Sequence, residues 1–267
     1  MKKSAYLIGP FVGDLRWEYY YFAPYIITLA KRDPRRIFIV FTRSSRFDLY
    51  GAYSDILVPL KIANDVPEAV NKFKMNGFGM HECNMLLKAY HNKYKKRYNI
   101  SKTIYPDISR FLFKVKWQFP RNEMDYNFQP RKENAKIINM FIQKHNVFVD
   151  NFNDLFDSIS LDNYETIYAK ELFSQVTNYI HTGKVSILGC FIEVIKTCQF
   201  VIGNLSSDYS RLALLLKKPL IVLNETLSDD SIHLINPLNT PVIRCNDIKE
   251  GMDIYENHFR SPKCGTG

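Results

Sequence analysis

The stretch QFVIGNLSSDYSRLALLLKKPLIVLN, residues 199–224, decides the fold class. It reads as a buried strand (QFVIG), a tight polar turn (NLSSD), a helix (YSRLALLLK) and a second buried strand (KPLIVLN). Buried strands that alternate with helices are typical of a parallel sheet covered on both faces. The stretch therefore predicts an α/β protein.

The start of the chain has the same order of elements. Residues 4–9 read as a strand that ends at a glycine, and residues 15–32 as a long apolar helical segment. Asp33-Pro34 ends that helix. Strands at 36–42 and 55–60 follow, the first dense in β-branched and aromatic residues.

The strand and helix rhythm resumes near Arg131. Past a helix from about residue 132, further strands are predicted at 146–149, 165–169 and 241–245, and further helices at 188–197 and 249–258. We expect two Rossmann-like domains, residues 1–134 and 135–267, with a cleft between them.

The segment between these halves is basic. Residues 88–136 hold thirteen Lys and Arg, four Asp and Glu, and ten aromatic residues, without strand alternation, so we expect a basic helical insert. Residues 1–134 carry 24 Lys and Arg against 12 Asp and Glu, or +12, and residues 135–267 carry 12 against 15, or −3; the two sum to the +9 of the chain. This asymmetry indicates that the first half meets a polyanion or an anionic membrane surface.

Composition excludes several classes. A hydrophobic content of 46% and a mean hydropathy of −0.22 are typical of a globular protein. No apolar run approaches the roughly 18 residues of a membrane span, and the start lacks a signal peptide, so we expect a cytoplasmic protein without stable membrane insertion, in the host cytoplasm if it is viral. The five cysteines are scattered without a C-x-x-C pair and the six histidines without H-x-x-x-H spacing, so neither a disulfide framework nor a metal site is indicated. P-loop and G-x-G-x-x-G motifs are both absent from the sequence.

The turn after the strand at 199–203 is a candidate anion site. Gly203, Asn204, Ser206, Ser207 and Asp208 stand at the start of the following helix, where hydroxyls and backbone N–H groups can bind a diphosphate. The alternative is that Ser206 or Ser207 is only an N-cap.

VIGNLSSDYSRLALLLKKPLIVLNE, with SILGCFIEVIKTCQF before it, resembles the nucleotide-sugar half of GT-B glycosyltransferases, most closely the heptosyltransferase-like group. Their pattern is a strand ending in Ile-Gly-Asn, then Asp-Ser-Gly, a helix carrying a His, and Lys-Pro before the next strand. This chain has Leu205-Ser206-Ser207 in place of Asp-Ser-Gly, and Ser210 or Arg211 where the His stands. The resemblance implies a UDP-sugar co-substrate on the second half, an acceptor on the first half, and no cofactor or essential metal.

Three further residues are candidates for the donor site. Arg211 stands in the matching helix, and Lys184 could neutralise diphosphate charge. Glu225 could accept the ribose hydroxyls, although an exposed loop carboxylate is the commoner meaning of such a residue.

The loop after the first strand, GPFVGDLRWE, is a candidate for the acid–base chemistry. GT-B enzymes of this kind keep an acidic residue there, and a carboxylate at a strand end can take the proton of an acceptor hydroxyl. Asp14 is the first candidate for this base and Glu18 the second; the alternative is that they form the cap of the helix that starts at Leu15. Gly13, Arg16 and Trp17 share the loop, and Trp17 reads as core or cleft wall.

Basic residues of the first half are candidates for acceptor binding. Arg43 and Arg46 follow the second strand, where they could hold acceptor phosphates or lie on a solvated loop. The basic segment adds Lys95, Lys96, Arg97, Lys114 and Lys116, interleaved with aromatic residues as on a nucleic-acid surface. An anionic membrane face or an inert basic helix are the alternatives.

The N-terminal phrase LIGPFVGDLRWEYYYFAPYI, with FTRSSRFDLYG, is similar to glycosyltransferases of large tailed phages that modify hydroxymethylated bases in their DNA. That resemblance implies transfer of glucose or arabinose from a UDP-sugar to 5-hydroxymethylcytosine in duplex DNA. The alternatives are a glycan or lipopolysaccharide glycosyltransferase at the membrane face, a GT-B-like nucleic-acid-binding protein without catalysis, and a nucleotide-sugar epimerase.

Overall fold

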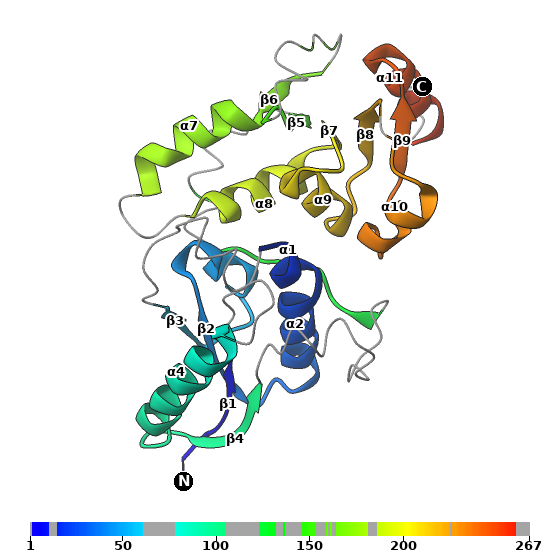
Figure 1. Ribbon diagram of the computed structural model, residues 1–267. Coiled ribbons are helices and arrows are strands. Elements are labelled where there is room, and N and C mark those ends of the chain that lie inside the picture. The colour runs from blue at the N-terminus through cyan, green and yellow to red at the C-terminus, as the bar shows by residue number, and fades with distance from the viewer. Residues whose placement is uncertain are drawn as a thin grey trace, which may run out of the picture. The chain divides into compact units, whose positions relative to one another are not determined.

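The computed structural model describes residues 2–10, 15–60, 78–104, 123–131, 136, 146–152, 159, 161, 164–180, 186–224 and 226–259. The chain divides into two compact units, shown with their elements in Figure 1. Unit 1 consists of residues 1–135 and 183–190, and unit 2 of residues 136–182 and 191–267. The chain therefore passes from one unit to the other three times.

Unit 1 contains a parallel sheet. Its described strands are β1 (Ser4–Ile8), β2 (Ile37–Thr42), β3 (Ile56–Pro59) and β4 (Asn99–Ile104), in the order β3-β2-β1-β4. The chain between β1 and β2 forms α1 (Leu15–Trp17), a π-helix η1 (Glu18–Phe22) and α2 (Ala23–Arg32). A 3₁₀ helix η2 (Ser44–Leu49) follows β2, and α4 (Phe78–Tyr94) precedes β4.

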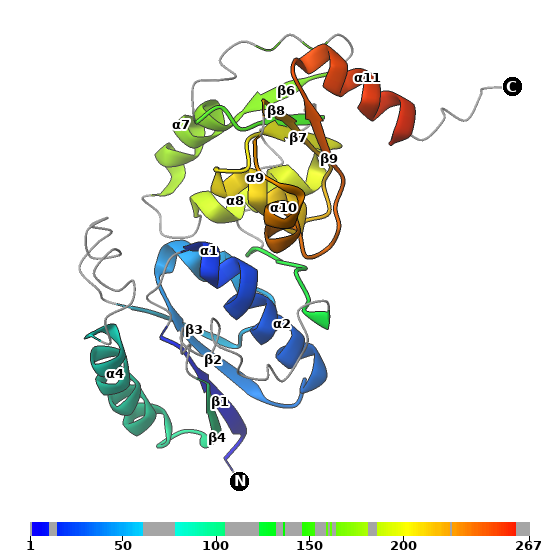
Figure 2. The same cartoon turned by 45° about the vertical axis from the view of Figure 1, so that its right-hand side comes forward.

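Helices cover both faces of this sheet. Leu87, Tyr90 and Tyr94 of α4 pack against one face, where the Tyr90 ring lies 4.3 Å from the ring of Phe41, centroid to centroid. In Figures 1 and 2, α2 lies over the opposite face. Alternate strand residues therefore meet different helices, which explains why five consecutive residues of β2, Ile37–Phe41, are apolar.

The expectation that the basic insert contains no strand is wrong at residues 99–104, whereas residues 88–94 are helical as part of α4. Residues 99–104, NISKTI, form β4, which pairs in parallel with β1 at five of its residues and has a register shift at Ser101. α4 is the crossover helix that leads to this strand. Among the described strands, β4 is at the edge of the sheet and is exposed at most positions. Polar side chains are therefore tolerated there, and the apolar pattern of a buried strand is missing.

Unit 2 contains a second parallel sheet. Its described strands are β5 (Val147–Val149), β6 (Thr166–Tyr168), β7 (Phe200–Gly203), β8 (Leu220–Leu223) and β9 (Val242–Cys245), in the order β6-β5-β7-β8-β9. The described helices are α7 (Ala169–Ile180), α8 (Ile187–Thr197), α9 (Asp208–Leu215), α10 (Asp229–Ile235) and α11 (Ile248–His258). The first part of α8, residues 187–190, belongs to unit 1.

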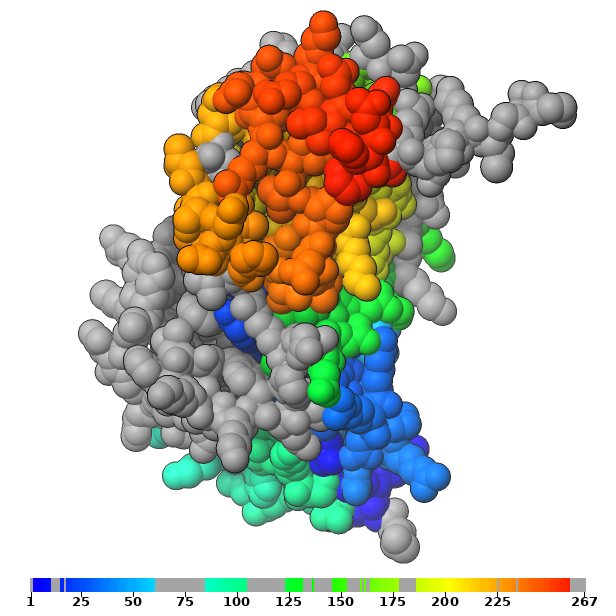
Figure 3. Space-filling view, turned by 90° about the vertical axis from the view of Figure 1, so that its right-hand side faces the viewer, coloured from blue at the N-terminus to red at the C-terminus, as the bar shows by residue number. Residues whose placement is uncertain are grey.

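Aromatic side chains of the helices pack against both faces of this sheet. Phe200 meets Tyr255 of α11 on one face, with 4.3 Å between ring centroids. Phe148 meets Phe191 of α8 on the other face, at 5.6 Å. In Figure 3, the part of the surface of unit 2 that α10, β9 and α11 form is coloured orange to red.

The α/β class and the two Rossmann-like units predicted from the sequence are confirmed. β7, α9 and β8 reproduce the strand, turn, helix and strand of residues 199–224. Among the described helices, none is long and apolar enough to cross a membrane.

Candidate active site

The strand order of unit 2 reverses at one place. β5 and β6 neighbour each other on one side, whereas β7, β8 and β9 extend the sheet to the other side, so the reversal lies between β5 and β7. Ligands of open parallel sheets bind outside the carboxyl ends of the strands at such a reversal. Asp150 directly follows β5 and Asn204 directly follows β7. The predicted donor turn therefore stands at the position that the topology favours for a ligand.

The turn is held by the Asn204 side chain. Its Oδ1 accepts hydrogen bonds from the backbone N–H groups of Ser206 and Ser207, both at 3.0 Å, and from the Ser206 hydroxyl. Ser207 is the N-cap of α9, because its Oγ accepts from the Tyr209 N–H at 3.3 Å. The cap alternative therefore holds for Ser207, whereas the Ser206 side chain is exposed and lies one residue before the cap.

Asp150 joins β5 to α9. Its Oδ2 accepts from the Ser210 N–H at 3.1 Å and from the Ser210 hydroxyl at 2.8 Å, and both residues are buried. Its Oδ1 has no hydrogen-bond partner within the described part of the chain. Burial raises the pKa of the Asp150 carboxyl, and hydrogen bonds to the carboxylate oppose that rise.

The contact between Asp150 and Ser210 requires a glycine at position 203. A Cβ at Gly203 would lie 2.1 Å from the Ser210 Oγ and 3.1 Å from the Asp150 Cβ. Atoms at those separations overlap, so a side chain at position 203 would push α9 away from β7. The glycine is therefore explained by helix-to-strand packing.

The N–H groups at the start of α9 are largely occupied. Those of Ser206 and Ser207 point to Asn204, that of Tyr209 to Ser207, and that of Ser210 to Asp150. A diphosphate would compete with these oxygens for the backbone donors. Side chains are thus better placed to bind it, and Arg211 is the half-buried cation of the turn, with its Nε donating to the Leu205 carbonyl.

An aromatic stack sets the position of α9. The Tyr209 ring lies 4.1 Å from Phe191 and 5.5 Å from Phe152, centroid to centroid. Burial raises the pKa of Tyr209 to about 12, so its phenol is neutral at physiological pH. The stack therefore fixes the helix start with apolar contacts beside the polar turn.

In unit 1 the order of the described strands reverses between β1 and β4, which places the carboxyl end of β1 at the favoured position. Gly9 ends β1 with φ of 96°, in the left-handed region that favours glycine, and its N–H donates to the Ile104 carbonyl at 2.9 Å.

Glu18, in the π-helix η1, is a buried acid whose carboxylate accepts hydrogen bonds from three other side chains. The Thr42 hydroxyl, the Arg46 guanidinium and the Tyr50 hydroxyl each lie 2.7 Å from a carboxylate oxygen. Burial, followed by the Glu18 charge, raises the pKa of Tyr50 well above its ordinary value. Through these contacts, Glu18 connects η1 to β2 and η2. Glu18, the predicted second base, is thereby paired with Arg46, one of the predicted acceptor cations.

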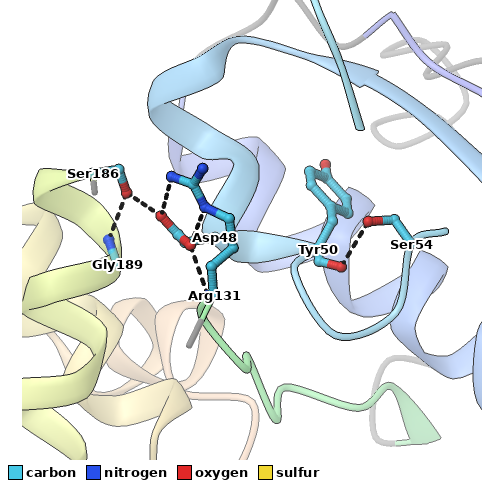
Figure 4. A network of polar contacts seen from close by, with 6 residues as sticks. All are labelled: Asp48, Tyr50, Ser54, Arg131, Ser186 and Gly189. Carbon is cyan, nitrogen blue, oxygen red and sulfur yellow. Dashed lines mark hydrogen bonds and ion pairs between the residues drawn. The ribbon is translucent and has the colours of Figure 1, made fainter. Parts of the chain in front are cut away.

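A second buried carboxylate in unit 1, Asp48, forms the network of Figure 4. It accepts from the Arg131 backbone N–H at 2.9 Å, from the Arg131 Nε at 3.1 Å, and from the Ser186 hydroxyl. Ser186 in turn accepts from the Gly189 N–H at 3.0 Å, at the start of α8. Asp48 therefore connects η2 by hydrogen bonds to two segments that are distant from it in the sequence.

The structure separates two groups of predicted acceptor residues. Arg43 and Arg46 follow the carboxyl end of β2, with Arg43 half-buried and Arg46 buried. The exposed residues Lys95, Lys96 and Arg97 precede β4, at the amino end of the same parallel sheet. Since β1 spans five residues at about 3.3 Å each, roughly 17 Å separates the two edges.

The remaining candidates are placed as follows. Arg16 is half-buried in α1, and Trp17 is described only as part of that helix. Asp208 is the first residue of α9. The residues outside the described ranges are Gly13, Asp14, Lys114, Lys116, Lys184 and Glu225. No group of three or more potential metal ligands occurs within the described ranges.

The sequence interpretation missed Asp150 and the role of Ser210 as its partner. An acid directly after the short strand 147–149 was the available signal, because residues that follow parallel strands gather at the binding edge.

No protein-family model and no curated protein sequence matches the chain. Among solved structures, the chain is similar to a family 9 glycosyl transferase from Veillonella parvula DSM 2008, with 11% identity over 97% of this chain and 92% of the other and a TM-score of 0.47. It is also similar to the E. coli ADP-heptose LPS heptosyltransferase II, with 14% identity over 95% of both chains and a TM-score of 0.44. A further E. coli heptosyltransferase, solved with ADP, gives 9% identity over 95% of this chain and 98% of the other and a TM-score of 0.43.

Proposed function

We propose that the chain is a glycosyltransferase that uses a nucleotide-sugar donor. The observation that carries this proposal is the meeting of Asp150 and the turn Asn204–Asp208 at the reversal point of a parallel sheet, directly before the helix that resembles the donor-binding helix of GT-B enzymes. A fold alone is compatible with many activities, so the polar turn and its neighbours give the proposal its chemistry.

The donor site uses side chains to hold the diphosphate. The Arg211 guanidinium supplies positive charge, while Asn204 and the exposed Ser206 hydroxyl supply polar groups around the turn. Lys184 and Glu225 remain predictions for the diphosphate and the ribose. In the reaction, an acceptor oxygen bonds to the anomeric carbon as the bond to the diphosphate oxygen breaks. The nucleoside diphosphate leaves with the bonding electron pair, and a carboxylate, predicted to be Asp14, takes the acceptor proton.

The acceptor is anionic in this proposal. Residues 83–106 include no Asp or Glu, whereas the described residues 85–104 include Lys88, Lys93, Lys95, Lys96, Arg97 and Lys102. A phosphorylated glycan such as a lipopolysaccharide core is the first candidate. It needs only a local cationic surface, whereas the DNA interpretation relies on basic and aromatic residues spread over residues 93–121. Duplex DNA with 5-hydroxymethylcytosine is the second candidate, favoured by the aromatic residues among these cations.

Transfer assays decide among these functions. The protein would be incubated with UDP-sugars and ADP-sugars together with rough lipopolysaccharide, hydroxymethylcytosine DNA or unmodified DNA. Release of nucleoside diphosphate and a mass increase of one acceptor identify both substrates. Binding of DNA without nucleotide-sugar binding or transfer would instead support the non-catalytic nucleic-acid-binding alternative.

A matched pair of variants tests the donor site. Arg211→Ala is expected to raise the KM for the nucleotide sugar about tenfold, because a charged hydrogen bond to the diphosphate contributes on the order of 1.5 kcal/mol. Lys249→Ala removes an equal charge from an exposed position on α11 and should leave the KM unchanged. Equal effects of both variants would remove Arg211 from the donor site.

A further inference from the structure

We propose that unit 1 carries a second anion site, at the amino edge of its sheet, that binds a phosphate ester. The site is a hollow of about 500 Å³ between the end of α4, the start of β4 and the N-terminal residues. Its lining residues are Lys2, His91, Lys95, Tyr98, Asn99 and Ile100. This volume is within the range of small-molecule sites, about 300–1,000 Å³.

The residues that line the hollow include cations and no acidic side chain. Lys2 and Lys95 line the hollow, with exposed Lys3, Lys96 and Arg97 beside them in the sequence. The nearest acidic residues in this part of the sequence are Glu82 and Asp107. The described cations from Lys88 to Lys102 therefore belong to a surface that attracts anions over a distance of several ångströms before any contact forms.

Hydrogen bonds fix the backbone of the hollow. The Lys95 N–H donates to the His91 carbonyl and the Tyr98 N–H to the Tyr94 carbonyl, both at 2.9 Å, which extends the hydrogen bonding of α4 past its end. The Asn99 N–H donates to the Lys3 carbonyl at 2.9 Å and ties the N-terminal residues to β4. The hollow is therefore largely pre-formed, which lowers the entropic cost of binding.

Lys2 counters the negative end of α4. Carbonyl groups at a helix C-terminus carry partial negative charge and would oppose an anion. The Lys2 Nζ donates to the Lys95 carbonyl at 2.9 Å and so neutralises that end. This bond uses one of the three donors of the ammonium group, which leaves it able to donate to a phosphate as well.

The chemistry of the lining selects an ester over bare inorganic phosphate. The two lysines match the charge of a phosphate group, and the Asn99 amide can bond to a hydroxyl. Tyr98 and Ile100 add an apolar surface on which a sugar ring or a glycerol moiety can lie. Such an ester is supplied by a soluble sugar phosphate or by a lipid headgroup. The hollow lies about 17 Å from the carboxyl edge of the sheet, where Arg43 and Arg46 stand. It shares Lys95 with the cationic surface that is proposed to attract the anionic acceptor.

Binding to the full chain tests this site without any sugar donor, so the result is independent of the proposed transferase activity. Calorimetry with glucose 6-phosphate and co-sedimentation with phosphatidylglycerol vesicles distinguish the two sources of the ester. We expect Lys2→Ala/Lys95→Ala to weaken binding at least about tenfold, because two charge-assisted hydrogen bonds are lost.

The matched control is Lys88→Ala/Lys93→Ala, which removes the same charge from exposed positions of α4 outside the hollow. Its affinity should fall by less than about threefold, since only long-range attraction is reduced. Melting temperatures of both variants check that they fold. Equal losses in the two variants, or no binding of either probe by the wild-type protein, would overturn the site. Binding of glucose 6-phosphate or of vesicles, lost only in the first variant, would establish it for that source.

Discussion

For single residues, the two units are comparable in that each buries an acid near the carboxyl end of its strands. The hydrogen-bond partners of the two acids differ. The Glu18 carboxylate accepts hydrogen bonds from three donors, one of which is a guanidinium. Asp150 accepts two hydrogen bonds from Ser210 on one oxygen, and burial raises its pKa. The first acid is paired with a cation, whereas the bonds from Ser210 to the second come from neutral groups.

Replacing Glu18 separates a structural role from a catalytic one. Glu18→Ala removes the carboxylate opposite the buried Arg46, and truncation of one partner of a buried ion pair costs about 3 kcal/mol of unfolding free energy. Urea unfolding measures this loss, and Glu18→Gln, which keeps an oxygen acceptor, should lose less. Stability within about 0.5 kcal/mol of wild type, together with abolished transfer, would instead identify Glu18 as the base.

The raised pKa of Asp150 predicts a pH-dependent stability. The folded protein holds the Asp150 proton more tightly than the unfolded chain, so the neutral carboxyl contributes stability that is present below the ordinary value of 3.8 and is lost as the pH rises through the folded-state pKa. Asp150→Asn keeps an oxygen for Ser210 and cannot ionise. In urea titrations, its unfolding free energy relative to wild type should therefore rise as the pH is raised from about 4 through the folded-state pKa of Asp150. A constant difference across that range would contradict the proton assignment.

At the scale of the element, strand-to-helix packing explains which features of the candidate site were predictable. The Ser207 cap is local, because the serine bonds to a residue two positions away, and the polar turn could therefore be predicted from NLSSD. The Asp150–Ser210 contact joins residues 60 positions apart, and no periodicity in the sequence reports such a pair. β4 escaped prediction because its environment is an exposed edge.

Gly203 provides the test of this packing. Gly203→Ala should lower the unfolding free energy by about 1–3 kcal/mol, because its Cβ overlaps the Ser210 hydroxyl. In Gly203→Ala/Ser210→Gly the overlapping side chain is absent, and part of the loss should be recovered relative to the sum of the single changes. Strict additivity in urea unfolding would show that the clash is not the cause.

At the scale of the whole molecule, the alternation of strands and helices could be predicted because parallel strands buried on both faces are apolar throughout. The return of residues 183–190 to unit 1 could not be predicted, because it depends on contacts between residues that are far apart in the sequence. The Ser186 hydroxyl donates to Asp48 across 138 positions, and Arg131 bonds to the same carboxylate. One buried side chain therefore anchors to unit 1 two segments that lie near places where the chain passes between the units.

This anchor predicts a coupling between Asp48 and Ser186. Asp48→Ala removes the acceptor of both Arg131 and Ser186 and should lower the unfolding free energy by about 3 kcal/mol, whereas Ser186→Ala should cost about 1–2 kcal/mol through the lost hydrogen bond and the lost contact with the Gly189 N–H. Because the two single changes remove the same bond, the double variant should be less destabilised than their sum by about 1 kcal/mol. Urea unfolding of the four proteins measures this difference. Ser54→Ala is the control, since that serine donates to the Tyr50 carbonyl in the same unit without touching Asp48, and it should show no coupling to Asp48→Ala. Additive losses for Asp48 and Ser186 would mean that the return of residues 183–190 to unit 1 is maintained by other contacts.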